Sequence, residues 1–121
     1  MEAPMHALIV EDKPVFSDRW RRFLQHRSFT VAVAVSQTEA FREFRNKTPD
    51  LIICDNDIVP CAMYDDIFDG GFFFITKIRA EGFAGRIIFY TRGRQSYFQG
   101  ETDIIPLNVR YIQKRFKRQS I

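Results

Sequence analysis

Several features that mark specialised classes of protein are missing from this sequence. The two cysteines, Cys54 and Cys61, lack the paired spacing of a zinc site. No apolar run approaches the roughly 20 residues of a membrane span, and the N-terminus has neither the basic nor the apolar region of a secretory signal. The net charge of +3 is too small an excess to indicate nucleic acid by itself. We therefore expect a cytoplasmic protein without a membrane partner.

The chain has enough apolar residues for one packed core. Its 121 residues are 45% hydrophobic and include 13 Phe, and a domain of this length buries roughly two thirds of its unfolded surface. Cys54 lies inside an apolar run, where a small buried hydrophobic residue is expected. The sequence contains no internal repeat, low-complexity tract or linker. Residues 1–121 are therefore predicted to form one domain.

Strands and helices are predicted to alternate along the chain. Short apolar runs predict strands over residues 6–12, 29–35, 51–55, 86–91 and 109–113. Pro14 opens a first helix, a capping box of Ser36 and Glu39 opens a second, and a third is expected over residues 72–81. The apolar faces of these helices comprise Phe16, Trp20, Phe23 and Leu24, then Ala40, Phe41 and Phe44, then Phe74, Ile75 and Ile78. This alternation predicts an α/β fold with a parallel sheet.

The C-terminal part is less regular. Glycines and a proline interrupt residues 92–108, so a fourth helix there would be irregular, and residues 115–121 would form about two turns of a short fifth helix. This short end suggests a domain cut from a longer regulator. The basic residues near it are expected to form a solvated helix face, and direct nucleic-acid binding is not expected. They are Arg110, Lys114, Arg115, Lys117 and Arg118.

Polar side chains stand where the predicted strands end. Glu11 and Asp12 follow the first strand, and Asp55 ends the third. Thr91 ends the fourth, and Lys114 follows the fifth. The carboxyl ends of parallel strands share one edge, where open α/β sheets bind ligands. Clustered carboxylates suit a hard cation such as Mg²⁺, and a hydroxyl and an ammonium suit phosphoryl oxygens. The set predicts phosphoryl transfer with Asp55 as the nucleophile.

Four stretches of the chain, in this order, resemble the receiver domains of two-component response regulators. They are Leu8-Ile-Val-Glu-Asp-Lys-Pro14, Pro49-Asp-Leu-Ile-Ile-Cys-Asp55, Ile87-Ile-Phe-Tyr-Thr91 and Tyr111-Ile-Gln-Lys-Arg-Phe116. The resemblance implies a flavodoxin-like, doubly wound sheet of five parallel strands in the order 2-1-3-4-5, with helices on both faces. It implies a phosphorylated signalling domain rather than an enzyme. The expected partners are a sensor histidine kinase or a phosphotransfer protein, and a second copy or an effector domain for output.

The resemblance also implies a role for each site residue. Asp55 would accept the phosphoryl group. Asp12 and Asp55 would hold Mg²⁺ with the backbone carbonyl of Asp57, and Glu11 would help through water. Thr91 and Lys114 would contact the phosphoryl group, and Tyr111 would be the switch aromatic that moves with Thr91.

Other interpretations stay open at this point. Asp55-Asn56-Asp57 by itself could merely start a turn. The same pattern resembles haloacid-dehalogenase-type phosphatases, and an early glutamate with a later Asp-x-Asp resembles the Toprim fold. A degenerate receiver that binds proteins without being phosphorylated is a further alternative. It is kept open by Arg92, which replaces the family's small residue, and by Pro60, which lies one residue later than usual before a longer loop. The complete set of Asp12, Asp55, Thr91 and Lys114 argues against it.

Overall fold

The computed structural model describes residues 3–58, 70–91 and 108–113, and within them strands and helices alternate. The elements are β1 (His6–Val10), α1 (Pro14–Gln25), β2 (Thr30–Ala34), α2 (Gln37–Asn46), β3 (Leu51–Asp55), α3 (Gly70–Ala80), β4 (Arg86–Thr91) and β5 (Arg110–Gln113). All the predicted strands are present, with ends that differ from the prediction by at most two residues. The predicted fourth and fifth helices fall on 92–107 and 114–121, outside the described residues.

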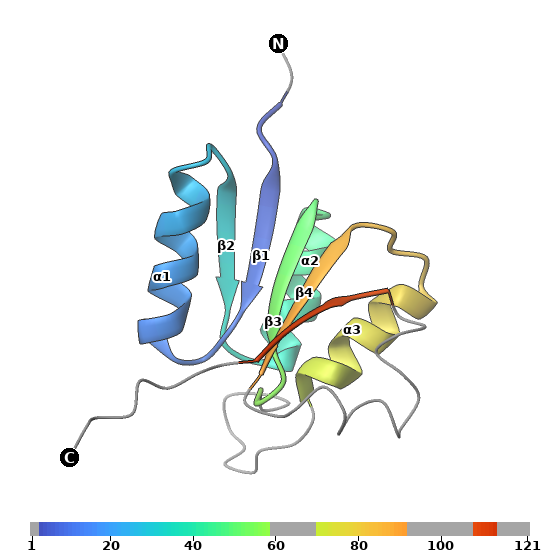
Figure 1. The fold of residues 1–121 in the computed structure, drawn as a ribbon. Coiled ribbons are helices and arrows are strands. Elements are labelled where there is room, and N and C mark those ends of the chain that lie inside the picture. Colours follow the sequence, from blue (N-terminus) through green and yellow to red (C-terminus); the bar gives the residue numbers. More distant parts are fainter. Residues whose placement is uncertain (1–2, 59–69, 92–107, 114–121) are drawn as a thin grey trace, which may run out of the picture.

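The five strands form one parallel sheet in the order β2-β1-β3-β4-β5. Helix α1 lies on one face of this sheet, and α2 and α3 lie on the other (Figure 1). The order places β1 and β3 side by side at the centre, where the chain reverses its direction of winding. The predicted flavodoxin-like fold is therefore confirmed. Among the described residues, no helix combines the length and the apolar character that crossing a membrane requires.

The face covered by α2 and α3 holds the larger core. Phe74, Ile75 and Ile78 of α3 are fully buried there, as predicted. The Phe74 ring meets Phe41 and Phe44 of α2 edge to face, with centroids 4.9 and 6.3 Å apart. Alternate residues of the central strands fill the other side, including the buried Cys54. Aromatic rings and aliphatic side chains thus pack together in this layer.

The core on the face covered by α1 is smaller among the described residues. Leu24 is buried against the sheet, and Trp20 packs edge to face on Tyr90 with centroids 5.6 Å apart. The prediction that Phe23 shares this buried face is wrong, since its side chain is 47% exposed. Phe23 lies at the edge of the apolar stripe of α1, and the Arg27 guanidinium sits 3.6 Å above its ring. A cation–π contact at the surface replaces burial there.

Local signals explain where the helices begin. Ser36 Oγ accepts a hydrogen bond from the Glu39 backbone N–H at 3.2 Å, and Glu39 Oε1 accepts one from the Val35 N–H at 3.4 Å. The predicted capping of α2 is confirmed. Helix α3 begins at Gly70, two residues earlier than predicted. Strand β1 ends at Val10, so the two acids that follow it lie just beyond the sheet.

Candidate functional site

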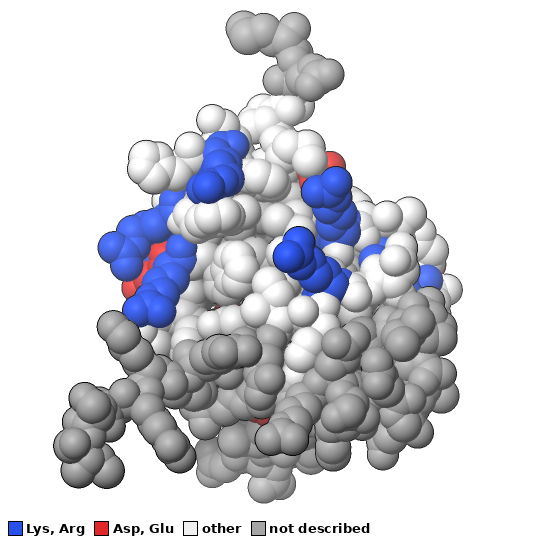
Figure 2. All heavy atoms as spheres, in the orientation of Figure 1, with Lys and Arg blue, Asp and Glu red and all other residues white. Residues whose placement is uncertain are grey.

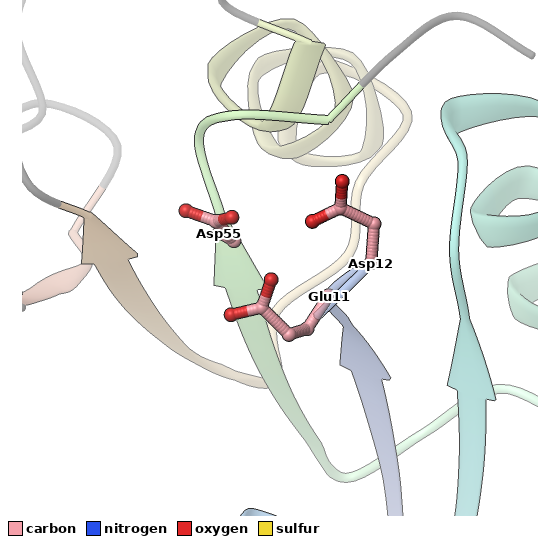
Figure 3. A group of neighbouring side chains, drawn as sticks. All are labelled: Glu11, Asp12 and Asp55. Atoms are coloured by element: carbon pink, nitrogen blue, oxygen red, sulfur yellow. The ribbon is translucent and has the colours of Figure 1, made fainter. Parts of the chain in front are cut away.

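Three carboxylates meet at the carboxyl end of the two central strands. Glu11 and Asp12 directly follow β1, and Asp55 ends β3. The two strands are in register, with Val10 opposite Cys54. One carboxylate oxygen of each acid lies within 4.8 Å of the others (Figure 3). The expectation that these acids converge is therefore confirmed by the geometry, although Glu11 and Asp55 are 44 residues apart in the chain.

The acidic group is buried on one side and open on the other. Asp55 and Glu11 are 1% and 2% exposed, whereas the Asp12 side chain is 36% exposed. Glu11 Oε2 accepts a hydrogen bond from the Lys13 N–H at 3.3 Å, and Lys13 Nζ lies 4.0 Å from Asp12 Oδ1. Buried carboxylates need a compensating positive charge or hydrogen bonds. A donor set of carboxylate oxygens with one open side fits a hard divalent cation that keeps part of its water shell.

The structure describes only some of the other predicted site residues. Asp57 lies just beyond Asp55 and Asn56, and its carboxylate is outside the acidic group. Thr91 ends β4, one residue after Tyr90, which pairs with Asp55 across the sheet. Thr91 is thus brought to the same edge as the acids. Lys114 lies outside the described residues, so its expected approach to the site stays a prediction.

Tyr111 lies in β5 opposite Phe89. Its ring packs against Phe89 with centroids 6.5 Å apart and belongs to the core under α2 and α3. Burial raises the pKa of the Tyr111 hydroxyl. The side chain therefore lies on the opposite face of the sheet from α1, and its expected switching movement stays a prediction.

Asn56, next to the acidic group in the chain, was not singled out from the sequence. It is 4% exposed, directly follows Asp55, and its side chain contacts the first turn of α3. The signal that could have found it is the pair Gly70-Gly71, which opens α3 where a close approach to other backbone needs residues without side chains. Recognising the contact would still have required knowing which segment approaches.

Comparison with known proteins removes two of the alternatives that the sequence left open. The model of the response regulator receiver domain matches residues 7–121. The chain belongs to this family. The phosphatase and Toprim interpretations are thereby replaced, and the strand order and the acid group agree with the receiver assignment.

Solved receiver structures share the fold. The signal receiver domain of a putative LuxO repressor protein from Vibrio parahaemolyticus superposes with a TM-score of 0.74 at 15% identity, over 95% of this chain and 82% of that chain. The response regulator TrrA from Thermotoga maritima, solved in complex with Mg²⁺-BeF, gives a TM-score of 0.71 at 21% identity, over 93% of this chain and 88% of that chain. At these identities the likeness establishes the fold alone.

A curated relative matches a shorter part of the chain. The methanol utilization control regulatory protein MoxX from Paracoccus denitrificans is 36% identical over 56 residues, which are 46% of this chain. The match covers 25% of the length of that regulatory protein. What the whole relative does therefore does not transfer directly to this receiver.

Proposed function

We propose that this receiver domain accepts a phosphoryl group on Asp55 and changes conformation to pass on a signal. The observation that carries the proposal is the convergence of three carboxylates within 4.8 Å at the carboxyl edge of the sheet. Asp55 ends the central strand, next to the opening beside Asp12. Its family supplies the expectation of phosphoryl transfer, and its own residues supply a matching site.

The acidic group fits Mg²⁺ as the cofactor. Glu11, Asp12 and Asp55 offer only oxygen donors, which a hard cation prefers. The backbone carbonyl of Asp57 is the proposed further ligand. When bound, Mg²⁺ would neutralise the carboxylates and the incoming phosphoryl oxygens and so lower the barrier electrostatically.

The chain's own residues carry out the proposed transfer. A carboxylate oxygen of Asp55 attacks the phosphorus of a phosphohistidine whose other ring nitrogen carries a proton. The P–N bond breaks, its electron pair stays on the ring, and the neutral imidazole leaves, giving an acyl phosphate. Thr91 and Lys114 are proposed to bind the phosphoryl oxygens. Tyr111 would then respond to a movement of Thr91. The domain is modified and slowly loses the group, and it does not turn over a separate substrate.

Mass spectrometry tests this proposal directly. After incubation with acetyl phosphate and Mg²⁺, the wild-type chain should gain the mass of one phosphoryl group, and hydroxylamine should remove it. Asp55→Asn should abolish the gain, whereas Asp57→Asn should keep it, since only the backbone of residue 57 is assigned a role. Absence of any gain in the wild type, with Mg²⁺ present, would favour the degenerate, protein-binding receiver that the sequence also allows.

The proposal also names partners and a location. The phosphodonor would be a sensor histidine kinase or a phosphotransfer protein, and the output would pass to an effector domain or a second copy of the chain. Because such kinases use ATP, we place the domain in the cytoplasm. A pull-down comparison of the unmodified and the phosphorylated domain would identify the partner that distinguishes the two states.

A further inference from the structure

The residue after the proposed phosphoacceptor faces the opposite way. Strand alternation turns Asp55 to the side of the acidic group, and Asn56 points instead to the face covered by α3. Both side chains are almost fully buried, at 1% and 4% exposure. One short segment therefore carries the reacting carboxylate on one side and an amide buried against a helix on the other.

Asn56 holds the first turn of α3 through two hydrogen bonds. Its side-chain Oδ1 accepts a hydrogen bond from the Phe72 N–H at 3.1 Å, and its backbone carbonyl accepts one from the Gly71 N–H at 3.1 Å. The first four N–H groups of a helix have no partner within the helix. Asn56, which directly follows β3, thus accepts hydrogen bonds from two of these N–H groups in α3. The same carbonyl also accepts the Ile58 N–H at 2.8 Å, which ties down the backbone around Asp57.

Helix α3 approaches this segment so closely that no side chain fits at Gly70 or Gly71. A Cβ atom placed on Gly71 would overlap the carbonyl oxygen of Asp55 and would lie 2.8 Å from the Cα of Asn56. A Cβ on Gly70 would overlap the carbonyl oxygen of Ile58. The first turn of α3 therefore lies directly on the backbone of residues 55–58, with no side chain between them.

We propose that Asn56 is a positioning residue, which fixes the Asp55 carboxylate and the Asp57 carbonyl by holding α3 against their backbone. Cation binding at the acidic group and docking of the first turn of α3 are then coupled. Because such coupling is reciprocal, a bound cation should also tighten the contact of α3. The inference rests on the proposed function for the identity of the cation, Mg²⁺.

Two variants that each remove one capping bond provide the test. Asn56→Leu removes the acceptor for Phe72 N–H, and Ser36→Ala removes the equivalent acceptor at the start of α2. Titration calorimetry with Mg²⁺ should show a dissociation constant raised about tenfold in Asn56→Leu, the loss typical of residues that orient metal ligands. In Ser36→Ala it should stay at the wild-type value. Equal affinity in both variants would overturn the positioning role.

A second pair covers the case in which Asn56→Leu does not fold. Gly71→Ala forces a side chain against the Asp55 carbonyl, whereas Gly82→Ala strains a positive φ of 101° with nothing within 4 Å of the new atom. Both lose stability, and only Gly71→Ala should lose Mg²⁺ affinity. Unchanged affinity in Gly71→Ala would contradict the proposal.

Amide hydrogen exchange tests the coupling in the other direction. Mg²⁺ should slow exchange of the Phe72 N–H in the wild type, and the Glu39 N–H at the start of α2 should show no change. A uniform effect on both amides would overturn the coupling. Absence of Mg²⁺ binding by the wild type would overturn both the inference and the metal site, whereas binding without phosphorylation would refute the proposed phosphoacceptor alone.

Discussion

The two faces of the sheet differ in how completely they are closed. Among the residues that the structure describes, the core on the face under α2 and α3 contains twelve buried residues, and the core under α1 contains four. On the α1 side, a groove of about 360 Å³ remains between Trp20, Phe23 and Tyr90. Figure 2 looks onto this side and shows, among the described residues, Lys and Arg side chains beside a centre that carries no charged side chain. Among the described residues, one face is therefore closely packed, and the other keeps a groove.

The difference between the two faces matters for Asp55 and Asn56, whose side chains point to opposite faces of the sheet. Asp55 points to the acidic group beside the exposed Asp12, and Asn56 is anchored on the closed side. A phosphoacceptor must be reachable by its donor, yet its ligands must keep their positions. Dense packing on one side of the sheet can hold the ligands in position without blocking the access of the donor from the other side.

Removing a ring from each face should give the largest contrast. Phe74→Ala deletes a fully buried ring that contacts two others, so it should lower the free energy of unfolding by about 3–5 kcal/mol. Trp20→Ala removes a partly buried ring and should cost roughly 1–2 kcal/mol, near the value of its aromatic contacts. Urea unfolding measures both. Similar losses would show that the α1 face is as closed as the other.

A charge change at the acidic group should have a smaller effect, of the opposite sign. Without metal, Asp55→Asn should raise the free energy of unfolding by about 1 kcal/mol, because it removes a buried charge beside two others. Asp12→Asn should have a weaker effect, since that side chain reaches solvent. Mg²⁺ should raise the melting temperature of the wild type by mass action and leave that of Asp55→Asn unchanged. Thermal melts with and without Mg²⁺ measure this, and an equal response of both proteins would contradict the assignment.

The smallest predicted effect concerns the opposite edge of the sheet. His6 is buried at the start of β1, where its Nδ1 lies 2.7 Å from Thr30 Oγ1. Burial, and then the charge of Lys47, lower the pKa of His6, while Thr30, Asp50 and Glu43 oppose the shift. The folded state therefore resists protonation more than the unfolded chain does. Stability should be constant above the unfolded pKa of about 6.5 and should fall as the pH drops below it.

Urea unfolding between pH 5 and 8 checks this slope, since histidines are the side chains that normally titrate there. His6→Gln should flatten the pH dependence, and His26→Gln, at an exposed position, should leave it in place. If the pH dependence of the free energy of unfolding persists in His6→Gln, another titrating group must cause it.

Most of the fold was predictable because its signals are local. The capping bond of Ser36 and the burial of Phe74 follow from residues within one helix, and the runs around Leu51 and Ile87 mark strands without help from the rest of the chain. The meeting of the three acids was also predictable, because parallel strands must end at one edge.

Other features depended on the tertiary structure alone. Whether Phe23 is covered is decided by what lies opposite α1, and its spacing in the helix could not reveal that. Asn56 is a residue type common in turns, and its side chain accepts a hydrogen bond from the N–H of Phe72, 16 residues later. The sequence determines which residues can start a helix, end a strand or carry a charge, because these properties belong to single residues and their neighbours. The folded chain alone decides which of them touch, because contacts between distant segments depend on how the whole sheet and its helices pack.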